Sequence, residues 1–201
     1  MRKLVFLFMI VTLLGMSTPA QALIIGPDWV KFNPATKTIS GATATITDIT
    51  GGVQIVMNVT NFPSGSQDVT EWYFNVGANI SLDTATFPYV SGVHATSIDL
   101  QDKADGTGGV FDLHFTFATS GSDTFTVLKS STYQVLLPNL TAAAFNSMSQ
   151  GGQEDYVSAI KNGEAFWGTN TAAAAVPEPA TLLLIGVGLI GLAGVSRKFR
   201  K

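Results

Sequence analysis

The stretch VQIVMNVTNF, residues 53–62, decides the fold class of this chain of 201 residues. Polar side chains at Gln54, Asn58 and Thr60 fall between apolar ones that recur at every second position: Val53, Ile55, Met57 and Val59. An alternation with period two, with one apolar and one polar face, is typical of a strand in an antiparallel sheet that covers a core on one side. We therefore predict a strand whose apolar side chains point inward.

The stretch VFDLHFTFA, residues 110–118, repeats this pattern, with inward positions at Phe111, Leu113, Phe115 and Phe117. Turn-forming residues separate the strands at 51–52, 63–66, 104–109 and 120–123. Further strands are expected at residues 43–49, 69–76, 93–100, 124–129 and 132–137. Many short strands with frequent turns favour a mainly β fold, an antiparallel β-sandwich.

The pattern changes after Pro138, where residues 139–149 and 154–163 predict two short helices. Asn139 or Thr141 is placed to cap the first helix, and Gly163 to end the second. We expect a single β domain over residues 23–170, followed by a linker of small residues over 171–179. The chain has no cysteine, so this domain depends on its packed core for stability.

The first 22 residues predict a secretory signal peptide. Arg2 and Lys3 precede an apolar run, and Ala20-Gln21-Ala22 matches an A-x-A cleavage pattern. The apolar run is too short to span a bilayer. Cleavage after Ala22 would make Leu23 the first residue of an exported chain.

Charge is distributed unevenly along the chain. Residues 23–179 contain all 14 acidic side chains but only five basic ones, which gives this region a net charge of −9. A region with this negative charge repels nucleic acid, so we expect no nucleic-acid partner.

The C-terminal segment combines a polar motif, an apolar stretch and a basic end. Residues 180–195 carry no charge, and as a helix they would be about 24 Å long. A transmembrane helix over residues 180–196 is short but feasible if the flanking side chains extend it. The basic cluster after it would stay in the cytoplasm and stop translocation: Arg197, Lys198, Arg200 and Lys201.

The sequence VPEPATLLLIGVGLIGLAGVSRKFRK, residues 176–201, resembles the PEP-CTERM sorting signal of bacteria. The same segment is catalogued as the C-terminal domain of certain ice-binding proteins. The resemblance implies recognition by a membrane-embedded exosortase, which would read Pro177, Glu178 and Pro179. It also implies removal of the tail and delivery to the cell surface or the exopolysaccharide matrix. The alternative is an ordinary single-span anchor.

His94 and His114 are the only histidines. Together with Asp112 they offer zinc-type ligands, but their spacing matches no metal motif. We expect His114 to be an exposed histidine on the polar face of its strand.

Asp99, Asp102 and Asp105 recur at intervals of three before Gly106. Oxygen ligands on a tight loop suit weak Ca²⁺ binding. The alternative is a hairpin loop with Asp105-Gly106 as its turn, and no other cofactor is indicated.

Thr43, Thr45 and Thr47 form a row at period two. Such rows occur on ice-binding surfaces, but strands favour threonine in any case, so we expect an ordinary exposed face.

These observations favour an exported structural or adhesive protein of the cell surface or matrix, without enzymatic activity. The alternative is a surface module that binds Ca²⁺, polysaccharide or ice. A surface hydrolase is the least favoured class, because no catalytic motif is present.

Overall fold

The structure is a computed structural model of the chain. It describes the following residues: 21–26, 28–31, 38–62, 68–103, 109–149, 156–163, 165–169 and 172–174. All of them lie in one compact unit, Gln21–Val176.

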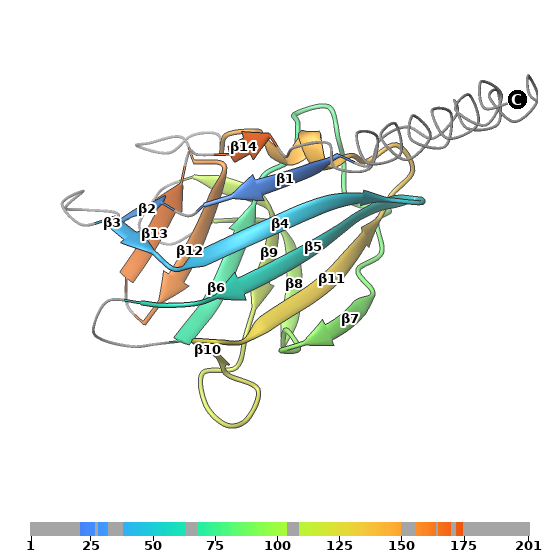
Figure 1. The fold of residues 1–201 in the computed structure, drawn as a ribbon. Helices are drawn as coiled ribbons and strands as arrows, with labels where there is room; N and C mark the ends of the chain where they lie inside the picture. The colour runs from blue at the N-terminus through green and yellow to red at the C-terminus, as the bar shows by residue number, and fades with distance from the viewer. Residues whose placement is uncertain are drawn as a thin grey trace, which may run out of the picture. The chain divides into compact units, whose positions relative to one another are not determined.

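Two antiparallel sheets make up the fold (Figure 1). Sheet A has six strands in the order β14 (Ala172–Ala174), β1 (Ala22–Ile25), β4 (Ala42–Ile49), β5 (Gly52–Val59), β11 (Ser130–Leu136) and β7 (Tyr89–Gly92).

Sheet B has eight strands. Seven follow the order β3 (Thr38–Ser40), β2 (Asp28–Lys31), β13 (Ala165–Thr169), β12 (Ser158–Asn162), β6 (Asp68–Phe74), β9 (Val110–Thr116) and β8 (Ser97–Lys103). The eighth, β10 (Phe125–Thr126), pairs with β6. The expectation of a mainly β fold with antiparallel sheets is confirmed.

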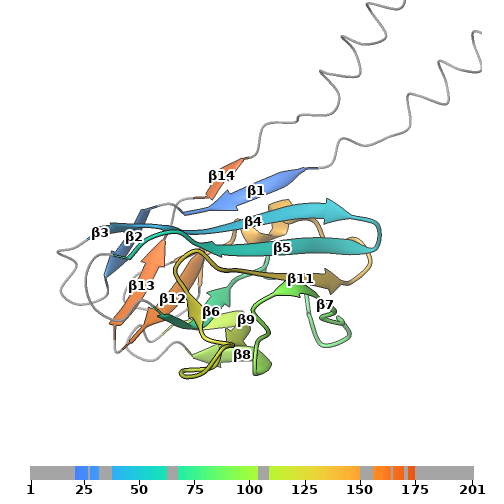
Figure 2. The ribbon, with the colours of Figure 1, turned by 60° about the horizontal axis from the view of Figure 1, so that its bottom comes forward.

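The two sheets lie one over the other (Figure 2). Their side chains form one shared core that is rich in aromatic rings. Phe115 of sheet B contacts Tyr133 of sheet A with ring centroids 5.1 Å apart. Trp72 lies at the centre, edge-to-face with Trp29 at 5.8 Å and stacked on Phe74 at 6.0 Å. Large buried rings in such pairs contribute more than their buried area alone.

The strand periodicity expected from the sequence is confirmed in β5 and in the segment that contains β9. Seven of the eight predicted inward positions are buried in the main core: Val53, Ile55, Met57, Val59, Leu113, Phe115 and Phe117. The eighth, Phe111, is also buried, but in a second cluster with Tyr73. The register places Ile55 between Ile46 of β4 and Tyr133 of β11, so apolar side chains of neighbouring strands meet on one face.

The chain passes between the sheets at two glycines. Gly26 separates β1 from β2, and Gly41 separates β3 from β4. Gly26 has φ +92°, and an added Cβ would lie 2.7 Å from the carbonyl oxygen of Ala42. The indole Nε1 of Trp29 donates a hydrogen bond to that same oxygen at 2.7 Å. This corner therefore needs glycine for space as well as for its backbone angle.

The prediction of a helix over residues 154–163 is wrong, because Ser158–Asn162 form strand β12. This strand lies inside sheet B, paired with β6 on one side and β13 on the other. Ile160 is buried in the main core, whereas Ala159 is buried in a second cluster. Since both faces are covered, the alternation that marks a half-buried strand is absent from its sequence. Gly163, expected to end a helix, follows the strand in a turn with φ +60°.

The helix expected over residues 139–149 is reduced to one 3₁₀ turn, η1 (Ala142–Phe145). Thr141 stands at its N-cap position but makes no side-chain cap bond. Instead Asp48 of β4 accepts a hydrogen bond from the Ala142 backbone N–H at 2.6 Å through Oδ1. The capping group comes from a distant strand, so no local sequence pattern could reveal it.

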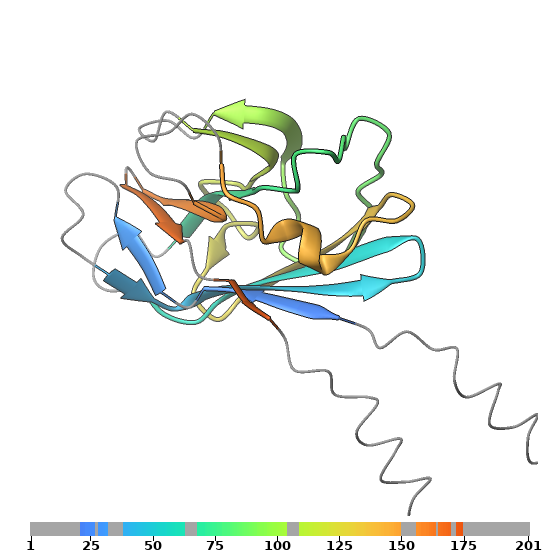
Figure 3. The same ribbon diagram turned by 90° about the horizontal axis from the view of Figure 1, so that it is seen from above.

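The last described strand falls within the predicted linker. Ala172–Ala174 form β14, which pairs with β1 so that Leu23 lies opposite Ala174 (Figure 3). The folded unit thus extends beyond the expected domain end at residue 170. None of the helices among the described residues is long and apolar enough to cross a membrane. The expected signal peptide up to Ala20, the transmembrane helix at 180–196 and the tail at 197–201 lie outside the described residues.

Candidate functional site

Three neighbouring strands of sheet B place Lys161, Glu71 and Thr116 in one row. Glu71 of β6 lies opposite Lys161 of β12 on one side and Thr116 of β9 on the other. Opposite residues in an antiparallel pair share a face of the sheet. Two residues further along β6, Tyr73 lies opposite His114. These side chains stand on the face of sheet B that points away from the main core.

Four of these residues form a compact set of contacts, called here the Glu71 network: Glu71, Tyr73, His114 and Lys161. Lys161 Nζ donates a hydrogen bond to Glu71 Oε1 at 2.7 Å, and the Tyr73 hydroxyl donates to Glu71 Oε2. His114 Nε2 lies 3.8 Å from Glu71 Oε2, and its ring stacks on Tyr73 with centroids 4.1 Å apart. Bonds to an ionised carboxylate are stronger than neutral ones, so this network holds the Glu71 side chain in place.

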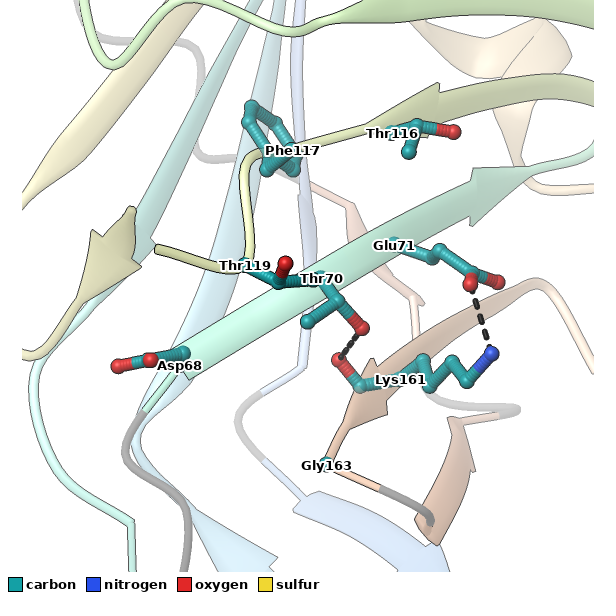
Figure 4. A pocket seen from close by; sticks show the side chains of 8 residues that line it. All are labelled: Asp68, Thr70, Glu71, Thr116, Phe117, Thr119, Lys161 and Gly163. Atoms are coloured by element: carbon teal, nitrogen blue, oxygen red, sulfur yellow. Dashed lines mark hydrogen bonds and ion pairs between the residues drawn. The ribbon is translucent and has the colours of Figure 1, made fainter. Parts of the chain in front are cut away.

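A pocket of about 370 Å³, called here the Glu71 pocket, lies beside this network (Figure 4). Glu71 and Lys161 form one side, and Asp68 lies at the other. The hydroxyl-bearing side chains of the lining are Thr70, Thr116 and Thr119. Phe117 also belongs to the lining, but only 1% of it is exposed, because its ring is part of the main core. The pocket therefore offers mainly hydroxyl, carboxylate and ammonium groups.

A β-bulge shapes one wall of the pocket. Lys161 of β12 pairs with Glu71, but the next residue, Asn162, pairs with Val69, so Thr70 is an extra residue on β6. Thr70 Oγ1 donates to the Lys161 carbonyl at 3.4 Å, and Asn162 Nδ2 donates to the Asp68 carbonyl at 3.0 Å. Bulges redirect side chains and are frequent beside functional sites.

His114 is not the exposed histidine that we expected, because only 6% of it is accessible. Its Tyr73 neighbour belongs to a second buried cluster with Phe111, Tyr156 and Ala159, on the outward side of sheet B. That cluster covers a face that alternation alone assigns to solvent. His94, in contrast, is exposed and contacts Tyr89 with ring centroids 4.7 Å apart. Among the described residues no group of three metal-ligating side chains is found.

The predicted Ca²⁺ ligands lie on or just after β8. Asp99 is exposed, and its Oδ2 accepts a hydrogen bond from Ser97 Oγ at 2.9 Å. For Asp102 only the backbone is described, and Asp105 lies outside the described residues. Lys103 of β8 pairs with Val110 of β9 on the far side of the residues that are not described. Ca²⁺ binding stays a prediction.

The threonine row belongs to a larger surface, called here the threonine face: Thr43, Thr45, Thr47, Gln54, Val56 and Asn58. These residues of β4 and β5 are half-exposed and lie opposite one another in register. The row continues from Ile24 of β1 through Thr45 and Val56 to Thr132 of β11. None of these side chains is charged. The sequence showed the three threonines but not the neighbours that the register places beside them.

The Glu71 network was not foreseen from the sequence. Lys161 and Glu71 are 90 residues apart, and only the pairing of β12 with β6 brings them together. The one available signal was an acidic residue inside the apolar strand sequence VTEWYFNV. The predicted sorting residues Pro177, Glu178 and Pro179 and the basic cluster at 197–201 lie outside the described residues. Ala22 of the predicted cleavage site is the first residue of β1.

Residues 175–198 match the family model of the PEP-CTERM protein-sorting motif. The resemblance noted in the sequence is thereby confirmed for this segment, which contains the Pro177-Glu178-Pro179 triplet. The motif supports an exported protein directed to an exosortase at the cell envelope. No curated protein and no solved structure matches this chain.

Proposed function

We propose that this chain is a structural or adhesive protein of the bacterial cell surface or exopolysaccharide matrix. An exosortase reads its C-terminal motif and removes the tail. The observation that carries the proposal is the PEP-CTERM motif at residues 175–198. On this view the β domain is the part that reaches the surface, and the two end segments act only during delivery.

The ends of the folded unit agree with processing at both termini. Signal-peptide cleavage after Ala22 leaves Leu23, and Leu23 pairs with Ala174, one residue before the motif begins. The compact unit spans Gln21–Val176. Removal of both end segments would therefore leave β14 paired with β1. This arrangement supports a domain that keeps its fold after the sorting signals are gone.

The proposal includes a membrane-bound precursor. Residues 180–196 form its transmembrane helix, and Arg197 and Lys198 begin a basic stop that stays in the cytoplasm. The precursor is anchored with the β domain outside until the exosortase acts. No catalytic activity is assigned to the β domain. Turnover of ester, glycoside or peptide substrates by the purified protein, abolished in His114→Ala, would contradict that assignment.

Fractionation of the native host tests the sorting part. The full chain is compared with a variant truncated after Val176 and with Glu178→Gln, which keeps the size of the side chain but removes its charge. We expect the full chain in the surface or matrix fraction and the truncated chain in the soluble exported fraction. We expect the Glu178→Gln variant to accumulate in the membrane with its tail attached. Equal surface delivery of all three chains would contradict recognition through this motif.

The adhesive part has its own test. A strain lacking the protein should lose cell-to-cell cohesion or matrix retention, measured by sedimentation and by shear release. The full chain should restore both, whereas the truncated chain should not. Unchanged cohesion in the deletion strain would contradict an adhesive role and leave the sorting result standing.

A further inference from the structure

Two polar side chains of the Glu71 pocket have no hydrogen-bond partner within the described part of the chain: the carboxylate of Asp68 and the hydroxyl of Thr119. Both belong to the lining. The Asp68 carbonyl accepts a hydrogen bond from Asn162, and the strand holds the Asp68 backbone opposite Thr126, so the position of the residue is fixed. Among the described residues, its carboxylate is an acceptor that a ligand with hydrogen-bond donors could use.

The opposite side of the pocket is already ordered. Lys161 Nζ is bonded to Glu71 Oε1 at 2.7 Å, and Tyr73 and His114 hold the same carboxylate from behind. The side chains of Lys161 and Glu71 remain 26% and 18% exposed, so both still offer polar atoms to a ligand. Pre-ordered groups lose less conformational entropy when a ligand binds.

The charge of the lining selects the class of ligand. Asp68 and Glu71 outweigh the single cation Lys161, which leaves one net negative charge. Phosphate and carboxylate ligands are therefore disfavoured, because they would meet an uncompensated anion. A neutral polyol is suited, since its hydroxyl groups donate to carboxylates and accept from the ammonium group and from threonine hydroxyls.

The shape agrees with this chemistry. The volume of about 370 Å³ is near the lower end of the range for small-molecule sites, enough for about one or two sugar rings. Phe117 also belongs to the lining but is only 1% exposed, so the groups that a ligand can reach are mainly hydroxyl, carboxylate and ammonium groups. The hydroxyl groups around a sugar ring can both donate hydrogen bonds to these groups and accept hydrogen bonds from them.

We propose that the Glu71 pocket binds a neutral, hydroxyl-rich sugar unit of a surface or matrix polysaccharide. Asp68 accepts hydrogen bonds from the sugar, Lys161 donates to it, and Thr119 contacts it at the rim. The inference rests on the proposed function, for which it names the partner class and the site. Its test is independent of sorting, because binding is measured on the purified chain.

The test uses the full chain, purified in an amine-oxide detergent because the head group of a glycoside detergent would compete. Saturation-transfer NMR and calorimetry measure binding of gluco-, galacto- and manno-oligosaccharides and of fragments of the host's own neutral polysaccharide. We expect saturable binding to at least one of them. Asp68→Asn should weaken it about tenfold or more, and Thr119→Val about three- to tenfold.

Matched controls come from a surface turn away from the pocket. Asp83 and Thr84 are exposed and do not line the pocket. Asp83→Asn and Thr84→Val remove the same groups as the two pocket variants, and we expect unchanged binding in both. Equal melting temperatures for all four variants would show that losses of affinity are not losses of fold.

Three results would overturn the proposal. The first is no saturable binding of any neutral sugar by the folded chain. The second is binding that survives Asp68→Asn together with Thr119→Val. The third is binding of amines such as spermidine, but not of neutral sugars, which would mean that the negative charge of the pocket selects cations. Each of these results leaves the C-terminal processing of the chain open to its own separate test.

Discussion

On sheet A the outward side chains of β4 and β5 are half-exposed and uncharged, whereas on sheet B the outward Tyr73 and His114 are buried. Both sheets cover the same core with their inner faces. The difference lies in a second cluster on sheet B, where Tyr73 packs with Phe111. Beside that cluster a carboxylate and an ammonium group are held together and the Glu71 pocket is formed. The charged side chains and the pocket therefore lie on the covered face, whereas the open face of β4 and β5 carries only uncharged side chains.

The largest expected difference between the two outward faces is in the cost of shortening one outward side chain on each sheet. Tyr73→Ala should reduce the free energy of unfolding by about 3–5 kcal/mol, because a large buried ring is removed. Val56→Ala, at an outward but half-exposed position of β5, should cost about 1 kcal/mol or less. Urea denaturation monitored by tryptophan fluorescence measures both. Similar losses for the two variants would mean that the faces are equally covered. Tyr73→Phe separates the ring from its hydroxyl and should cost about 1 kcal/mol.

The Glu71–Lys161 pair gives the next largest expected effect. Glu71→Gln should destabilise the fold by about 1–3 kcal/mol, because the partly buried Lys161 ammonium loses its anion. Combined with Lys161→Met in a double-mutant cycle, it should show a coupling of about 0.5–2 kcal/mol in favour of the native pair. A coupling near zero would mean that water, and not the network, satisfies the two charges.

The comparison extends to pH through Tyr133, an inward residue of sheet A. Burial raises the pKa of its hydroxyl above 10.0, while the hydrogen bond from the Ala95 N–H at 2.7 Å acts to lower it. A raised pKa in the folded state means that the unfolded chain releases its proton first as the pH rises. Stability should therefore be constant below about pH 10 and fall above it. In Tyr133→Phe this part of the fall should disappear, as measured by urea midpoints between pH 8 and 11; an unchanged slope would contradict the assignment.

The smallest effect is expected on the threonine face. Thr45→Lys should change stability by no more than about 0.5 kcal/mol, because the long side chain can extend from a half-exposed position into water. A loss of about 2 kcal/mol or more would show that this face is covered, which would remove the contrast with sheet B. Melting temperature and urea midpoint of the same sample provide the measurement.

The sequence predicted those parts of the fold in which one face of a strand meets water. Val53 and Val59 alternate with polar residues, and the structure buries both. The helix predicted for the segment that contains Ser158–Asn162 was wrong, because both faces of this strand are covered and its sequence does not alternate. The prediction that His114 is exposed was wrong for the same reason, since this face of sheet B is also buried. Alternation of apolar and polar residues shows that one face of a strand is buried. It cannot show whether other residues cover the second face.

The candidate site was less predictable than the fold. Its central pair joins β6 and β12 across 90 residues, and its bulge at Thr70 arises from the pairing register. Neither the strand pairing nor the bulge can be recognised from the residues next to it in the sequence. The sorting motif was predictable because a processing enzyme reads it as a linear peptide, so its information is contained in consecutive residues. The functional parts of this chain thus differ in whether folding is needed to assemble them.

The central claim is that the chain is exported, trimmed at its C-terminus and left at the surface as the β domain alone. Mass spectrometry of the terminal peptides, on protein recovered from the surface fraction of its own host, tests this most directly. The account predicts an N-terminus at Leu23 and a C-terminus near Pro179, with or without an attached group. A C-terminus at Lys201 in the membrane fraction, with no trimmed form elsewhere, would contradict it.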